Sequence, residues 1–173
     1  MLTEYGYRFE TVVANARERV PPHLTVGETT LCNAKAKATA VAALHPDAVV
    51  LGADTLVAVD GEPLGKPRNM QSAIKMLERL SGRTHEVYSG VWLMRAARGQ
   101  SGGFVEISRV RFRPLTSAEI REYTSRIHVL DKAGAYAAQE DPMQIIADIR
   151  GSRTNVIGLP MEALGKALKA FRA

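Results

Sequence analysis

The chain has 173 residues, enough for one ordinary domain or two small lobes, and with 46% hydrophobic residues it can bury a core without disulfides. Its 23 Lys and Arg against 18 Asp and Glu favour anionic ligands only weakly, because the acidic residues are interspersed. The densest basic stretch, Arg109, Arg111 and Arg113, alternates at strand spacing and predicts one solvated strand face. A single cysteine excludes an internal disulfide framework and a cysteine-based zinc cluster.

Two features bear on where the protein works. No apolar run approaches the ~18 to 20 residues that span a bilayer. The first residues carry neither the basic region nor the apolar region of a secretory signal. We therefore expect a cytoplasmic protein with no membrane partner, and the alternating basic residues give no reason to expect a nucleic-acid partner.

The first half of the chain predicts strands and helices in mixed order. The expected elements are a strand over 9–14, a helix over 28–44, a strand over 48–53, a hairpin whose arms are 55–59 and 63–64, and a helix over 69–80. The strand at 48–53 is a continuous apolar run, typical of a strand buried on both faces. The hairpin turns at Asp60-Gly61, a dipeptide suited to a tight turn.

The second half continues the same mixture. The expected elements are strands over 87–94 and 104–112 joined by a long loop over 99–103, a short helix from Thr116 toward Tyr123, a strand over 145–149, a loop over 151–158, and a helix from Pro160 to Phe171. Strands and helices do not alternate strictly. The order predicts an α/β fold with a mixed, partly antiparallel central sheet and flanking helices.

Asp54 is the first candidate for chemistry, because it ends a buried strand at the place where α/β sheets bind ligands. Lys66, between Gly65 and Pro67, adds a cation that suits phosphates. Residues 61–66 imitate a P-loop, but the glycines are one residue too close and Pro67 replaces the required Ser or Thr. Leu56 likewise stands where an aspartyl phosphatase needs its second Asp.

Other polar residues have structural interpretations when taken one at a time. His85 can serve as a hydrogen-bond donor, and Asp131 with Lys132 as a surface ion pair worth ~0 to 1 kcal/mol. Asn155 is typical of a turn. The other three histidines have no metal-ligand spacing.

Seven segments in a fixed order give these residues a common meaning. They are 5–9, 34–38, 51–55, 64–67, 80–87, 131–136 and 155–160. Together they resemble the Maf family of nucleoside triphosphate pyrophosphatases over essentially the whole chain. The resemblance implies a single domain over 1–173 with the ITPase/Maf-like fold and a ligand cleft between two lobes.

The resemblance also implies a reaction, namely hydrolysis between the α- and β-phosphates of a nucleoside triphosphate. By position, Asp54 resembles the family's catalytic acid and Glu18 its partner carboxylate, and both would hold Mg²⁺ or Mn²⁺. Lys37 and Lys66 would neutralise phosphate charge. The resemblance gives supporting places to His85, Asp131 and Lys132, and it implies a homodimer. The family name suggests a house-cleaning role or an influence on septum formation.

The nucleobase depends on Thr55 and Gln139, which match positions that accompany dTTP and UTP preference in the family. The 7-methyl-GTP branch resembles Tyr-x-x-Glu where this chain has residues 136–139. A neutral amide offers both a donor and an acceptor to a pyrimidine edge. The family usually has Gly after this Gln, whereas here residues 140–142 are Glu-Asp-Pro, which would place two negative charges and a rigid proline near the base.

A second departure concerns the beginning of the chain. Family members resemble Leu-Ala-Ser-x-Ser-Pro-Arg-Arg at a point before Met1, so we expect a sheet strand and an anion site of the family to be missing here. The alternatives are therefore a 7-methyl-GTP or ITP type of pyrophosphatase, and a catalytically impaired Maf-like protein that binds nucleotides or nucleic acid.

Overall fold

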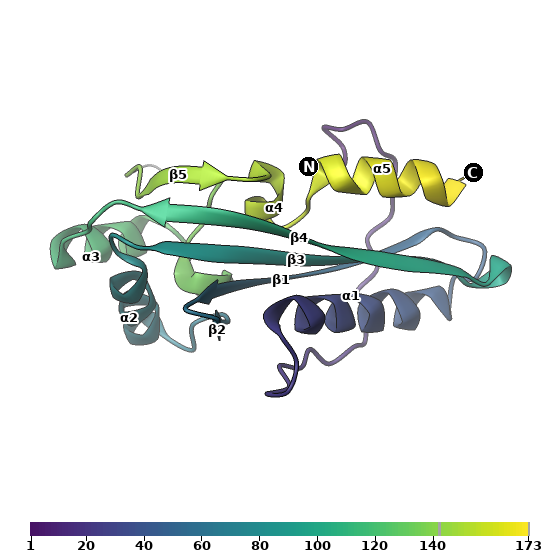
Figure 1. The fold of residues 1–173 in the computed structure, drawn as a ribbon, viewed down its shortest axis with the longest axis horizontal. Coiled ribbons are helices and arrows are strands. Elements are labelled where there is room, and N and C mark those ends of the chain that lie inside the picture. The colour runs from purple at the N-terminus through teal and green to yellow at the C-terminus, as the bar shows by residue number, and fades with distance from the viewer. Residues whose placement is uncertain (142, 173) are drawn as a thin grey trace. The chain divides into compact units, whose positions relative to one another are not determined.

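The computed structural model describes residues 1–141 and 143–172. Its elements are α1 (Val26–Ala42), β1 (Val50–Val59), β2 (Glu62–Leu64), α2 (Met70–Leu80), β3 (Thr84–Arg95), η1 (Ala96–Arg98), β4 (Gln100–Phe112), α3 (Ser117–Arg126), η2 (Ala133–Ala135), β5 (Ile146–Arg150), α4 (Arg153–Ile157) and α5 (Met161–Arg172). The strands form one sheet in the order β2-β1-β3-β4-β5 (Figure 1). The β1–β2 and β4–β5 pairs are antiparallel, which confirms the α/β class with a partly antiparallel sheet.

The chain divides into two compact units. The first unit comprises Met1–Thr55, Ser89–Glu106 and the chain from Gly158, and the second comprises Leu56–Tyr88 and Ile107–Ile157. Strands β1, β3 and β4 contribute residues to both units. Within the described part of the chain, every helix is too short or too polar to cross a membrane.

In the first unit, α1 lies directly on the β1 backbone. The helix begins with a capping box in which Thr25 and Glu28 satisfy each other's backbone N–H groups. A Cβ atom at Gly52 would lie 2.2 Å from the carbonyl oxygen of Ala34, so only glycine allows this approach. Helix α5 packs on the opposite face of the strands in a cluster made of Val91, Leu93, Met161, Leu164 and Leu168.

The second unit has its own hydrophobic core. Its largest fully buried members are Leu77 and Leu80 of α2, Phe112 of β4, and Ile120 and Tyr123 of α3. Helix α2 starts at the Asn69 cap, and α3 starts with the predicted capping box. The two helices therefore enter the core with satisfied first turns, which allows short helices to pack stably against the sheet.

The Asp60-Gly61 hairpin is confirmed, and it joins β1 to β2. Asp60 and Gly61 have positive φ angles of 54° and 78°, as a two-residue turn of type I′ between antiparallel strands requires. The strand predicted over 48–53 is present as β1, but it continues through Asp54 to Val59. The expectation that Asp54 ends the strand is therefore wrong, because the arm of the hairpin predicted over 55–59 is continuous with this strand.

Three expected elements are wrong. Residues 9–14 form no strand; Phe9 is 52% and Val13 is 93% exposed, and β-branched residues make a strand only where a neighbour strand pairs with them. The loop expected over 151–158 contains α4, which begins where the Ser152 hydroxyl accepts from the Asn155 N–H at 3.1 Å. The loop expected over 99–103 is shorter, since β4 already starts at Gln100.

Candidate functional site

Asp54 lies on β1 against α1, and it is 8% exposed. Helix α1 supplies two polar side chains one turn apart, Asn33 and Lys37, which face the carboxylate. The Lys37 Nζ donates to Asp54 Oδ1 at 2.8 Å, and the Asn33 Nδ2 donates to Asp54 Oδ2 at 3.0 Å. The close contact of α1 with Gly52 thus brings the helix near enough for both side chains to reach the acid.

Lys37 joins Asp54 to a second carboxylate. Its Nζ lies 2.8 Å from Glu18 Oε1 and also donates to the Ala53 carbonyl at 3.0 Å. Burial alone would lower the pKa of Lys37, but the hydrogen bonds to Asp54 and Glu18 outweigh it and the pKa is raised. The ammonium therefore stays charged between two carboxylates, and the structure brings together three residues predicted from sequence.

The two carboxylates that Lys37 joins are candidate ligands for a divalent cation. Oxygens of Glu18 and Asp54 converge on one positive centre, and carboxylate oxygens are the ligands that Mg²⁺ prefers. Each carboxylate has about four acceptor sites, so Asp54 keeps capacity beyond its bonds to Asn33 and Lys37. Across the described residues no group of three or more His, Cys, Asp or Glu could hold a metal. A cation here would need water or ligand oxygens to complete its shell.

Asn33 is a site residue that the sequence analysis missed. Its Nδ2 donates to the Arg19 carbonyl as well as to Asp54, and its Oδ1 accepts from the Arg19 N–H, each at 3.0 Å. Asn33 therefore ties the extended segment that carries Glu18 to the buried acid. Its position four residues before Lys37, on the same face of the predicted helix, is a signal that could have identified it.

Thr55 faces away from Asp54, since successive side chains of a strand point to opposite faces. Its hydroxyl lies 2.8 Å from the hydroxyl of Ser89 and donates to the Gly158 carbonyl at 3.3 Å. Ser89 is fully buried and was not a candidate from sequence. The hydroxyl of Thr55 thus has protein partners, which favours an indirect effect on any ligand over a direct contact.

The other candidates belong to the second unit. Lys66 is exposed on the loop after β2, and the carbonyl of the preceding Gly65 accepts from the Gly134 N–H at 3.2 Å. Gln139 is also exposed. Asp131 and Lys132 form the expected surface ion pair at 3.1 Å, and this hydrogen bond lowers the pKa of Asp131. These residues lie on loops, where binding residues are common.

His85 is a core residue of the second unit. Its Nε2 lies 2.9 Å from the Tyr136 hydroxyl, and its ring meets Phe112 and Tyr136 edge to face. Burial lowers the pKa of His85 to about 4 and raises the pKa of Tyr136. The neutral ring therefore supports the Tyr136 segment, consistent with the structural interpretation of this histidine.

The buried histidine predicts a loss of stability on acidification. Between pH 6.5, the ordinary pKa, and about 4, the unfolded chain binds a proton at His85 that the folded chain does not bind. The free energy of unfolding should therefore rise with pH across this window, by about 3 kcal/mol in total from this group. Urea unfolding from pH 4 to 7 measures it, and His85→Gln should flatten the dependence. An unchanged slope in the variant would contradict the assignment.

Comparison with known proteins gives consistent matches over the whole chain. A family model described as Maf-like protein matches residues 1–171. A dTTP/UTP pyrophosphatase of Akkermansia muciniphila is 44% identical over 99% of this chain and 89% of its own length. The dTTP/UTP pyrophosphatases of Carboxydothermus hydrogenoformans and Moorella thermoacetica are 43% and 42% identical over 99% of this chain, covering 91% and 88% of their own lengths.

Proposed function

The chain belongs to the Maf-like protein family, and from this premise we propose that it hydrolyses dTTP and UTP between the α- and β-phosphates, releasing pyrophosphate. The observation that carries the proposal is the convergence of Asp54, Glu18 and Lys37 in a chain 44% identical to a dTTP/UTP pyrophosphatase. Two carboxylates around a cation are suited to orienting water and phosphate oxygens.

Asp54 is proposed as the group that receives the proton of the attacking water. A bond forms from the water oxygen to the α-phosphorus, and the bond from that phosphorus to the bridging oxygen breaks. The water proton passes to the Asp54 carboxylate, and pyrophosphate leaves with the bonding electrons. Asn33 and Lys37 hold the carboxylate in one orientation, which reduces the cost of placing it in the transition state.

Glu18 and Asp54 are proposed to hold Mg²⁺ or Mn²⁺, which when bound would withdraw charge from the phosphate oxygens. When the cation takes the place of one of the two contacts of Lys37 with the carboxylates, the ammonium of Lys37 would neutralise phosphate charge. Lys66 is proposed to bind phosphate from its exposed loop, and Gln139 to contact the base. Thr55 acts on the base preference through its bonds to Ser89 and Gly158.

A panel of nucleotides tests the proposed function. Pyrophosphate release from dTTP, UTP, CTP, ITP and 7-methyl-GTP is measured with Mg²⁺ or Mn²⁺ and with EDTA. We expect the highest kcat/KM for dTTP and UTP, and loss of activity with EDTA. Preference for 7-methyl-GTP or ITP would replace the substrate assignment. Absence of pyrophosphate release from every nucleotide would reject the enzymatic function.

A further inference from the structure

Gln139 lies on an exposed loop whose two ends are fixed. We call residues 136–141 and 143–145 the Gln139 loop; Pro142, predicted to stiffen it, lies outside the described residues. Residues 134–138 are buried, whereas Gln139 and Glu140 are exposed. The Gln139 side chain, proposed to select the nucleobase, is therefore exposed to solvent, whereas the residues just before it are buried.

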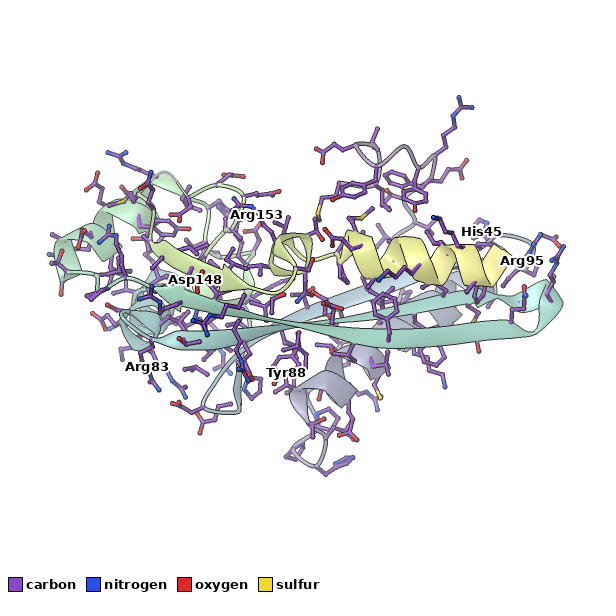
Figure 2. The ribbon with its side chains drawn as sticks, turned by 45° about the horizontal axis from the view of Figure 1, so that its top comes forward. His45, Arg83, Tyr88, Arg95, Asp148 and Arg153 are labelled. Carbon is purple, nitrogen blue, oxygen red and sulfur yellow. The ribbon has the colours of Figure 1, made fainter. Side chains whose placement is uncertain are left out.

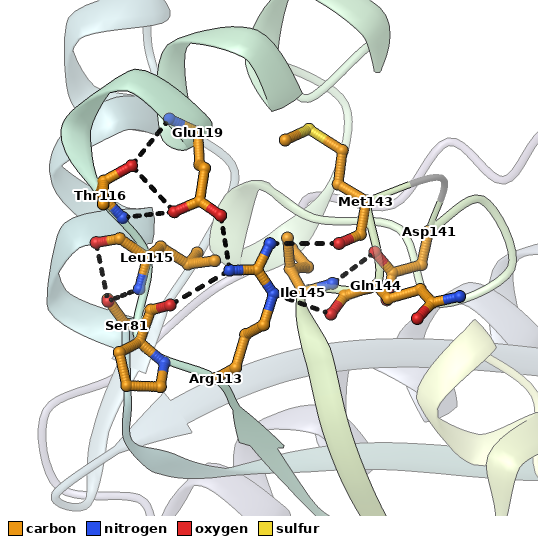
Figure 3. A network of polar contacts seen from close by, with 10 residues as sticks. Ser81, Arg113, Leu115, Thr116, Glu119, Asp141, Met143, Gln144 and Ile145 are labelled. Atoms are coloured by element: carbon orange, nitrogen blue, oxygen red, sulfur yellow. Dashed lines mark hydrogen bonds and ion pairs between the residues drawn. The ribbon is translucent and has the colours of Figure 1, made fainter.

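Asp141 anchors the side of the loop that leads into β5. Its Oδ1 accepts from the Ile145 N–H at 2.8 Å (Figure 3). Its Oδ2 accepts from the Ile146 N–H at 3.0 Å. Both carboxylate oxygens thus accept from backbone amides, one just before β5 and one at its first residue. The departure from the usual family sequence after Gln139 supplies a structural anchor, and the charge of Asp141 is directed into the protein.

Arg113 holds the same side of the loop from the end of β4. Its guanidinium donates to the carbonyls of Met143 and Gln144, each at 3.2 Å, and to Glu119 at 2.7 Å (Figure 3). A planar fork of donors can make these bonds at once, which a lysine cannot do. The prediction that Arg113 belongs to a solvated strand face is therefore wrong, because β4 ends at Phe112 and the half-buried Arg113 side chain is bonded to carbonyls and to Glu119.

The other side of the loop is held by Tyr123 and Arg153. The Ala137 N–H donates to the buried Tyr123 hydroxyl at 3.1 Å, and Arg153, labelled in Figure 2, donates to the Ala138 carbonyl at 3.3 Å. Two residues at the margins of the loop, Ala135 and Gln144, have positive φ of 61° and 50°. Non-glycine residues keep such conformations only where surrounding contacts enforce them.

We propose that Arg113 and Asp141 are positioning residues for base selection, because they fix the loop that presents Gln139. This inference rests on the proposed function. An amide held at one place can meet a pyrimidine edge and leave no room for a larger purine, whereas a mobile loop can adapt to either base. The anchors thus convert a general hydrogen-bonding side chain into a selective one.

The test is equilibrium binding of dTTP and GTP in EDTA, which needs no catalysis. Asp141→Asn leaves one acceptor oxygen for the two backbone amides of Ile145 and Ile146. Arg113→Gln removes the guanidinium that bonds the carbonyls of Met143 and Gln144. We expect dTTP affinity to fall about 5- to 20-fold, GTP affinity to change less, and the dTTP:GTP ratio to fall accordingly. Arg109→Gln is the matched control, since it breaks the exposed pair with Glu86 elsewhere on β4 and should leave the ratio unchanged.

Each outcome supports or overturns the inference. A wild-type ratio retained in Asp141→Asn overturns it, and so does a wild-type protein that binds dTTP and GTP equally. Urea unfolding shows whether Arg113→Gln folds, and the conservative Asp141→Asn decides if it does not. Where wild-type binding is selective but no pyrophosphate is released, the proposed function fails and the positioning inference stands on the binding ratios.

Discussion

Replacing Asp54 with asparagine is expected to lower pyrophosphate release from dTTP by roughly 10²- to 10⁴-fold, the range for loss of a general base. The amide cannot receive the water proton and is a poorer cation ligand. The fold should survive, because Lys37 keeps its bonds to Glu18 and the Ala53 carbonyl. Initial rates with saturating dTTP measure the effect.

Asp47→Asn is the control for this substitution. Asp47 is an exposed acid of the same unit, and removing its charge should leave the rate within about twofold of wild type. Urea unfolding of both variants separates loss of chemistry from loss of structure. A folded Asp54→Asn protein with the wild-type rate would remove Asp54 from the proposed mechanism.

Gly52→Ala is expected to produce the largest loss of stability, about 3 kcal/mol or more. The added Cβ would lie 2.2 Å from the Ala34 carbonyl oxygen and 2.8 Å from the Ala38 nitrogen, both backbone atoms of α1. The helix must move away from β1, which also carries Asn33 and Lys37 away from Asp54. The free energy of unfolding in urea measures the first effect and pyrophosphate release the second.

Gly102→Ala is its matched control in the same unit. A Cβ at Gly102 would meet no atom within 4 Å, so the free energy of unfolding should change by less than about 1 kcal/mol. Equal stabilities of the two variants would show that the contact between α1 and β1 can relax at little cost.

Local patterns predicted the features that depend on neighbouring residues. The capping box at Thr116, the helix that starts after Asn69, the Asp60-Gly61 turn and the C-terminal helix depend on interactions within a few residues. The continuous apolar run before Asp54 also predicted the buried strand, although β1 continues past Asp54 to Val59.

Patterns failed where a partner distant in sequence decides. Residues 9–14 have strand composition and no strand beside them, and the alternating spacing of Arg113 did not reveal carbonyl partners 30 and 31 residues away. The bonds of the Thr55 hydroxyl to Ser89 and to the Gly158 carbonyl, 34 and 103 residues along the chain, were likewise not visible in the sequence. Hydrogen bonds of this kind leave no periodic trace in the sequence.

The sequence by itself therefore determined the class of the fold, the family, and the residue types that can carry the chemistry. Only the tertiary structure decided that Asn33 orients Asp54 and that Lys37 joins Asp54 to Glu18. It also decided that the Asp141 carboxylate accepts hydrogen bonds from the backbone at the start of β5. The physical reason is that composition and spacing specify which groups a segment offers, whereas packing brings the groups of separate segments within hydrogen-bonding distance.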